Sequence, residues 1–202
     1  EVVIHDIAEE DKSCHSCGHE LHQMGEDKSE KLEFIPAKVK VIEYVVDNFS
    51  HIPLFLDPVS FAKTSKILHI IGKFHTVKPN KLEAELISSI SIKDDKSMLN
   101  AAQNIFDKGC KQIFITLGKD GVFYYDGKDY GHYLHQRVNI KSANGAGDAF
   151  TAGVVYGFLN LNGIKETAQF ASAAAVIALQ SKNTISDRLS EHNIKLLLKD
   201  EM

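Results

Sequence analysis

The sequence is poor in cysteine and contains no long apolar run. Its 202 residues include three cysteines, Cys14, Cys17 and Cys110. An odd count with one close pair argues against a disulfide framework, so we expect a reducing compartment, the cytoplasm. No apolar stretch approaches the roughly 18 residues that a membrane-spanning helix needs. The first residues, EVVIHDIAEEDK, are too acidic for a secretory signal peptide.

The chain has the composition of an ordinary globular protein, with 44% hydrophobic and 25% charged residues, which is enough to build a core. A formal net charge of −4 gives no support for binding nucleic acid or an anionic membrane. The charge is uneven, because residues 1–46 hold 11 acidic and five basic side chains, against 16 and 18 in the remainder. We therefore expect an appendage over residues 1–45 and one larger domain over 46–202.

From residue 52 onward, short apolar runs alternate with amphipathic segments. Strands are predicted over 52–56, 74–78 and 112–117, followed by a hairpin of 122–125 and 131–135 around Asp126-Gly127. Helices are predicted over 80–88, 97–108, 147–160, 168–180 and 190–199, with a short helix or turn over 66–71. The second of these helices would bury Leu99, Ala102 and Phe106 and stop at Gly109. Strands alternating with helices predict an α/β fold with parallel strands.

The strongest motif is the glycine-rich turn SANGAGDAF over residues 142–150, which opens an apolar helix. Its glycines let the backbone approach a ligand closely. A helix start adds unpaired N–H donors and a partial positive charge, so Gly145, Ala146 and Gly147 would form a site for a γ-phosphate. Asp148 could accept the proton of an attacking hydroxyl. The alternative is a capped helix that binds nothing.

The same turn, extended by Ala152-Gly153, resembles the signature of the PfkB (ribokinase-like) family of carbohydrate kinases. The resemblance implies a ribokinase-like parallel sheet flanked by helices, with ATP and Mg²⁺ as cofactors. It also implies an anion hole at Gly145–Gly147, Asp148 as the catalytic base and Asn144 beside the nucleotide. The family usually has Asp-Thr where this chain has Ser142-Ala143, a departure that bears on the subfamily.

Three further segments follow the order of that family. In VKPNKLEAE (77–85), Asn80 and Glu83 resemble the N-x-x-E motif that organises Mg²⁺ and its waters, and the same pair could form a helix capping box. Residues 116–121 resemble the T-x-G-x-x-G loop, which implies nucleotide contacts at Thr116, Gly118 and Gly121. A plain strand–turn–strand is the alternative there.

The segment Asp57-Pro58-Val59-Ser60 resembles the D-P-V segment of the family, which implies that Asp57 lies near the phosphates. The simpler reading is an Asx-type turn before proline. Together with VKPNKLEAEL, it is most similar to pseudouridine-kinase-like members. The resemblance thus implies a sugar or nucleoside acceptor.

Residues 4–44 resemble a different family, the zinc-finger segment of insertion-sequence transposases. Cys14 and Cys17 form a CxxC pair, half of a tetrahedral Zn²⁺ site. No second cysteine pair follows, so His15, His19 or His22 would have to complete it, and we expect weak zinc binding or none. A net charge of −6 over residues 1–46, from the counts above, speaks against DNA as a partner.

Kinases of this family also have a longer N-terminal half that binds the sugar. The resemblance therefore implies that the chain carries the nucleotide-binding part of the fold, truncated at its N-terminal half and fused to the appendage. Three functions follow: an active kinase, a non-catalytic nucleotide-binding remnant, or a zinc-dependent DNA-binding module. Core strands left uncovered would favour a homodimer or aggregation.

Overall fold

The structure, a computed structural model, describes residues 12–14, 16–20, 39–49, 51–134, 138–161 and 163–199. The chain divides into two compact units, Glu1–Pro36 and Ala37–Met202. The helices and strands of the described residues all belong to the second unit. None of these helices has the length and apolar character needed to cross a membrane.

The second unit has the α/β organisation expected from the sequence. Its elements are α1 (Val39–Asn48), β1 (Phe55–Leu56), α2 (Phe61–Thr64), η2 (Leu68–Lys73), β2 (Thr76–Val77), α3 (Lys81–Ser88), α4 (Asp95–Asp107), β3 (Gln112–Thr116), η3 (Gly118–Asp120), β4 (Val122–Tyr125), β5 (Tyr130–Tyr133), α5 (Ala146–Asn160), α6 (Ile164–Leu179) and α7 (Glu191–Lys199). The strands form one sheet in the order β1-β2-β3-β4-β5.

The sheet is mixed rather than wholly parallel. β1, β2 and β3 run parallel, whereas β4 is antiparallel to both β3 and β5. The hairpin predicted around Asp126-Gly127 is confirmed as β4–β5, although His135 of the expected second strand lies outside the described residues. β1 and β2 are shorter than the apolar runs that predicted them. Backbone hydrogen bonds from the His75 N–H to the Leu54 carbonyl and from the Lys78 N–H to the Leu56 carbonyl, both 2.9 Å, extend the contact beyond them.

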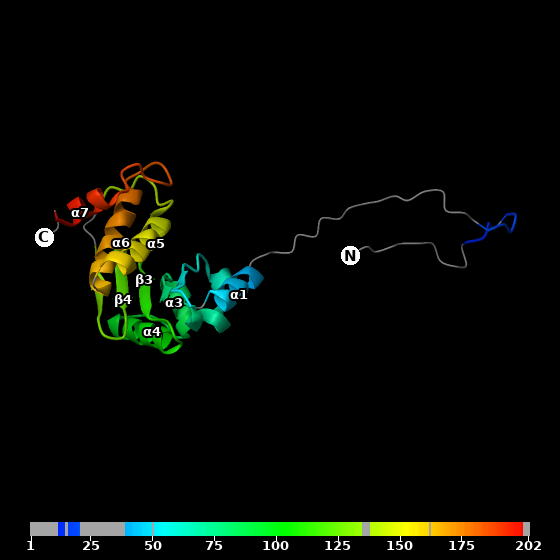
Figure 1. Cartoon of the computed structure of the whole chain (residues 1–202), viewed down its shortest axis with the longest axis horizontal. Helices are drawn as coiled ribbons and strands as arrows, with labels where there is room; N and C mark the ends of the chain where they lie inside the picture. The colour runs from blue at the N-terminus through cyan, green and yellow to red at the C-terminus, as the bar shows by residue number, and fades with distance from the viewer. Residues whose placement is uncertain are drawn as a thin grey trace. The chain divides into compact units, whose positions relative to one another are not determined.

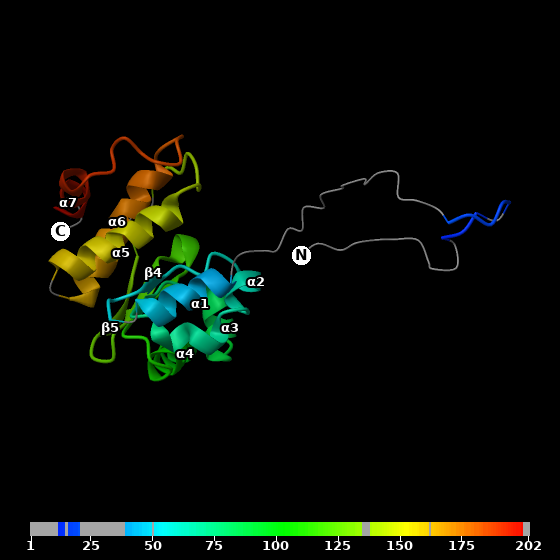
Figure 2. The same ribbon diagram turned by 45° about the vertical axis from the view of Figure 1, so that its right-hand side comes forward.

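Helices cover both faces of the sheet, and β3 shows why. Ile113 and Ile115 belong to one buried cluster, with residues of α3 and α4. Phe114 points to the opposite face and packs with α5 and α6. A strand buried on both faces reads as a continuous apolar run, as QIFIT does. Figures 1 and 2 show α5 and α6 on one side of the strands and α3 and α4 on the other.

The core face of α4 is rotated from the one predicted. Its fully buried residues are Met98, Ala101, Ala102 and Ile105, whereas Leu99 and Phe106 are only partly buried at the edge of the cluster. The predicted stop is confirmed: the helix ends at Asp107, and Gly109 follows with a φ of 125°. Both α3 and α4 begin with a capping box, at Asn80 and Asp94.

Helix α1 was not predicted, and it spans the expected domain boundary near residue 45. Val46 of this helix is completely buried in the same cluster as η2, α3 and α4, and Ile42 packs against that cluster. Asp47 also forms an exposed ion pair with Lys73, at 2.9 Å. α1 is therefore part of the α/β unit, which begins at Ala37.

β1 is an edge strand, and exposed apolar side chains flank it. Five large hydrophobic residues within positions 45–61 are at least one-third exposed, namely Val45, Phe49, Ile52, Val59 and Phe61. Apolar surface beside an unpaired strand edge is typical of a surface that another chain or segment covers.

α5 and α6 pack at unusually short range. A Cβ atom on Gly153 would lie 2.6 Å from the Cα of Ala171, and one on Gly157 would lie 2.5 Å from the Thr167 side chain. Five of the six alanines of α6 are accordingly buried. Cys110 is also buried, and burial raises the pKa of its thiol to about 12, so it is unreactive.

Candidate functional site

The family-like segments meet at one edge of the sheet, where the parallel strands end. Asn80 forms a parallel β-bridge with Thr116, and the Thr116 N–H donates to the Pro79 carbonyl at 2.9 Å. The N-x-x-E and T-x-G-x-x-G segments are therefore neighbours in space. The carboxyl ends of parallel strands are where open α/β sheets bind ligands.

At the start of α3, Asn80 and Glu83 form the predicted capping box. The Glu83 N–H donates to Asn80 Oδ1 at 3.0 Å, and the Asn80 N–H donates to Glu83 Oε2 at 2.8 Å. Glu83 is only 2% exposed, and its second oxygen, Oε1, is buried without a hydrogen-bond partner in the structure. A buried carboxylate oxygen without a partner is costly. Its donor chemistry fits Mg²⁺ or a water bound to it.

A second group joins the ends of β1 and β2 to α5. The Lys78 ammonium lies 2.7 Å from Asp57 Oδ2, and the two side chains are 10% and 22% exposed. The Thr151 hydroxyl donates to the same Asp57 oxygen at 3.1 Å and lies 3.0 Å from the Gly147 carbonyl. Asp57 is thus linked through Thr151 to the first turn of α5.

The backbone around Asp57 is strained. Val59 has a φ of 68°, in the left-handed region that β-branched residues avoid at a cost of about 1–3 kcal/mol. Next to it, the Val59 N–H donates to Asp57 Oδ1 at 3.3 Å. The predicted Asx-type turn is therefore present, and it orients the carboxylate that pairs with Lys78.

The glycine-rich turn forms the start of α5, with Gly145 as its N-cap. The first intrahelical bond runs from the Ala149 N–H to the Gly145 carbonyl. The amides of Ala146, Gly147 and Asp148 therefore have no intrahelical acceptor and are available to an anion. The Asp148 side chain is exposed beside them, and the Asn144 N–H donates to Ser142 Oγ at 3.2 Å.

The two glycines of this turn have different structural requirements. Gly145 has a φ of 80°, and a Cβ there would lie 2.0 Å from the Thr184 carbonyl oxygen. Gly147 has helical geometry, and a Cβ there would meet only the Lys78 ammonium, at 3.5 Å. The fold requires glycine at position 145. At position 147 it does not.

The T-x-G-x-x-G loop shows a similar division. A Cβ on Gly121 would lie 2.2 Å from the Tyr133 carbonyl oxygen, so this glycine permits β5 to approach. Gly118 also has a positive φ, of 62°, but nothing lies within 4 Å of its Cβ position. Gly118 therefore leaves space for a ligand, whereas the close approach of β5 is enough to explain the glycine at position 121.

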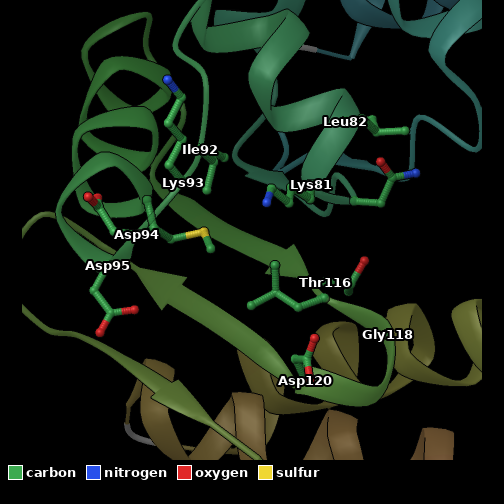
Figure 3. A pocket seen from close by; sticks show the side chains of 12 residues that line it. Lys81, Leu82, Ile92, Lys93, Asp94, Asp95, Thr116, Gly118 and Asp120 are labelled. Atoms are coloured by element: carbon green, nitrogen blue, oxygen red, sulfur yellow. The ribbon is translucent and has the colours of Figure 1, made fainter.

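A pocket of about 470 Å³ adjoins this loop on the side of α3 and α4. Figure 3 shows Thr116, Gly118 and Asp120 on one wall, with Lys81 and Leu82 of α3 around it and Asp94 and Asp95 at the start of α4. It includes Asn80, Thr116 and Gly118 among its lining residues, but not Gly145–Asp148. The pocket thus adjoins the ends of the parallel strands and does not include Asp148.

The sequence motifs did not identify Lys78 or Thr151 as site residues. Lys78 was predicted as the last residue of the strand over 74–78, and Thr151 as part of the helix over 147–160, with no role at a site for either. One signal was available, because a lysine at the carboxyl end of a parallel strand lies at the ligand edge of the sheet. Its ion pair with Asp57 depends on a contact over 21 positions and cannot be read from spacing.

In the first unit, Cys14 and Cys17 lie on a tight turn. The Gly18 N–H donates to the Cys14 carbonyl at 2.8 Å, and the Cys14 N–H donates to the His19 carbonyl at 2.9 Å. The Ser16 backbone and then the Cys17 thiol lower the pKa of the Cys14 thiol. Of the proposed completing ligands, His15 and His22 lie outside the described residues. Among the residues described, no group of three or more His, Cys, Asp or Glu could hold a metal.

We predict that this cysteine pair does not retain zinc by itself, because two thiolates fill half of a tetrahedral shell. After dialysis of the full chain against a mild chelator, metal analysis should find far less than one zinc per chain. Cys110→Ser serves as the control for the buried thiol. One equivalent of zinc that survives dialysis, and is lost in Cys14→Ser, would contradict the prediction.

Two protein families match different parts of the chain. Residues 33–191 match the pfkB family of carbohydrate kinases, and residues 11–49 match the zinc-finger binding domain of transposase IS66. The matches overlap at α1, whose Val46 is buried in the core of the α/β unit.

Individual relatives agree with the longer match. The chain is 30% identical over 162 residues to pseudouridine kinase of Escherichia coli (strain K12), covering 80% of this chain and 52% of that protein. It is 33% identical to an uncharacterized sugar kinase of the same organism, covering 76% and 43%. A solved structure described as a sugar kinase from Clostridium perfringens superposes with a TM-score of 0.75 and 34% identity, covering 81% and 51%.

The fold expectation is confirmed by structures that are more distant in sequence, such as ribokinase from Thermotoga maritima, with a TM-score of 0.65 and 20% identity. The chain spans about half the length of the relatives it matches. With the family match over residues 33–191 and the meeting of its characteristic segments at one sheet edge, this chain belongs to the pfkB family of carbohydrate kinases.

Proposed function

We propose that this chain binds ATP–Mg²⁺ and carries the phosphoryl-transfer site of a sugar or nucleoside kinase. The observation that supports this most strongly is the contact of Asp57 and Lys78, at the ends of β1 and β2, with the first turns of α5. That contact brings a helix start with free amides to the edge where Asn80 and Thr116 adjoin. Helix starts at such edges bind phosphate groups.

In this proposal the γ-phosphate lies against the amides at the start of α5, the anion hole of Gly145, Ala146 and Gly147. Asp148 accepts the proton of the attacking hydroxyl, which its exposed carboxylate can do without desolvation. Positioning and charge stabilisation account for most of the catalysis of such transfers.

Asn80 and Glu83 would hold Mg²⁺ through its waters, and the unpartnered Glu83 Oε1 supports that role. The ion would neutralise charge on the phosphates. The nucleotide would pass along Asn144, Thr116 and Gly118. Gly121, at the end of the same loop, has a structural role, because a Cβ atom there would lie 2.2 Å from the Tyr133 carbonyl oxygen.

The acceptor would be a sugar or a pseudouridine-like nucleoside, since a pseudouridine kinase is among the relatives. A second candidate is the non-catalytic nucleotide-binding remnant that the sequence also offered. It would keep the phosphate site but hold no acceptor in line. The exposed apolar residues around β1 would then support self-association. The acidic N-terminal segment offers less support for a zinc-dependent DNA-binding module.

Isothermal titration of the full chain with ATP tests the nucleotide site. We expect saturable binding at millimolar concentration or below, weakened when EDTA removes Mg²⁺. The reason is that free helix amides, Lys78 and a buried carboxylate lie around the proposed phosphate position. Absence of binding heat at millimolar ATP, for protein whose helix content is intact by circular dichroism, would contradict the proposal.

A further inference from the structure

Lys78 is an unusual residue for its position, because it is only 8% exposed. Taking an ammonium out of water is costly, and an ion pair with Asp57 offsets that cost only in part. Apolar side chains of similar volume would often stabilise a fold equally well at such a site. The stability of the fold therefore does not by itself explain why a lysine is buried at this position.

The ammonium has capacity for a further ligand. It can donate three hydrogen bonds, and the ion pair with Asp57 Oδ2 uses one of its directions. The same Asp57 oxygen also accepts from Thr151, and Oδ1 accepts from Val59. Asp57 is thus fixed from two sides, and it is the ion-pair partner of the Lys78 ammonium among the described residues.

The direction in which Lys78 points is given by Gly147. A Cβ atom on that glycine would lie 3.5 Å from the Lys78 Nζ, so the ammonium faces the first turn of α5. The amides of Ala146, Gly147 and Asp148 begin there. An anion bound to these amides would lie beside a partly buried cation, where low local polarity strengthens the attraction.

We propose that Lys78 is a further phosphate-binding residue, whose ammonium contacts the phosphoryl group held at the start of α5. Asp57 orients this ammonium and balances its charge when no nucleotide is bound. The inference rests on the proposed function and adds a ligand to its anion hole. The proposed contact is with the terminal phosphate of ATP. Because ADP lacks that phosphate, its affinity should depend much less on Lys78.

A double variant distinguishes phosphate binding by Lys78 from a purely structural role, in which the Lys78–Asp57 ion pair would only join the strand ends to α5. Lys78→Met alone leaves the Asp57 carboxylate unpaired and should lower stability, whereas Lys78→Met with Asp57→Asn removes both charges and should recover it. If Lys78 binds phosphate, the double variant should still bind ATP about 10- to 100-fold more weakly than wild type, since hydrogen bonds to charged groups are lost. Its ADP affinity should change far less.

The measurement is titration of the full-length proteins with ATP–Mg²⁺ and ADP–Mg²⁺, with thermal unfolding alongside. An unchanged ATP-to-ADP affinity ratio in the folded double variant would overturn the proposal and leave only the structural role. Wild-type protein that binds neither nucleotide would instead overturn the proposed function, and the role of Lys78 with it. Should the double variant not fold, the Lys78 ammonium signal of wild-type protein, assigned with Lys78→Arg, must shift in NMR spectra with ATP but not with ADP.

Discussion

Asp148→Asn is expected to remove nearly all phosphoryl transfer that this chain performs while leaving ATP binding in place. The amide keeps the shape of the carboxylate but cannot accept the proton of an attacking hydroxyl. Loss of a general base typically lowers the rate about 10²–10⁴-fold. A coupled assay of ADP release with a panel of sugars and nucleosides measures the rate, and titration calorimetry measures the binding.

Glu166→Gln is the matched control, because it removes a carboxylate from the first turn of the neighbouring helix α6 without touching the site. It separates loss of the base from a general change in charge at a helix start. The wild-type rate itself distinguishes the two proposed functions. Turnover of about 1–100 per second, as in intact kinases, would exclude the remnant, and equal rates for Asp148→Asn and wild type would refute the role of Asp148.

Gly145→Ala and Gly147→Ala are expected to have opposite effects, although the two residues are separated by a single position. At Gly145 the new Cβ would lie 2.0 Å from the Thr184 carbonyl oxygen at a φ of 80°. The left-handed conformation alone costs about 1–2 kcal/mol, and the contact forces the loop at Thr184 away. We expect a loss of several kcal/mol in the free energy of unfolding, measured in urea.

At Gly147 the substitution should leave the free energy of unfolding unchanged or raise it by up to about 1 kcal/mol, because alanine is the better helix residue. The methyl group would nevertheless occupy the space beside the α5 amides where the phosphate is proposed to lie. ATP affinity should therefore fall while stability does not. Equal ATP affinity in Gly147→Ala and wild type would place the phosphate elsewhere.

The sequence determined much of the fold because its signals are local. The run QIFIT predicts a strand buried on both faces, and β3 packs against helices on both sides. Asp126-Gly127 predicts the β4–β5 hairpin, since a tight turn depends on the backbone freedom of its own residues. Asn80 and Glu83 predict the capping box for the same reason, because both partners lie within one helical turn.

Only the tertiary structure decided which of these local features acts on a ligand. The sequence presents Gly145 and Gly147 as equivalent, and they differ because the Thr184 backbone covers one and the Lys78 ammonium faces the other. α1 joins the α/β unit because Val46 completes a cluster formed by residues far along the chain. Lys78 and Thr151 meet Asp57 over long separations. Contacts of this kind have no period or spacing, so they follow from packing alone.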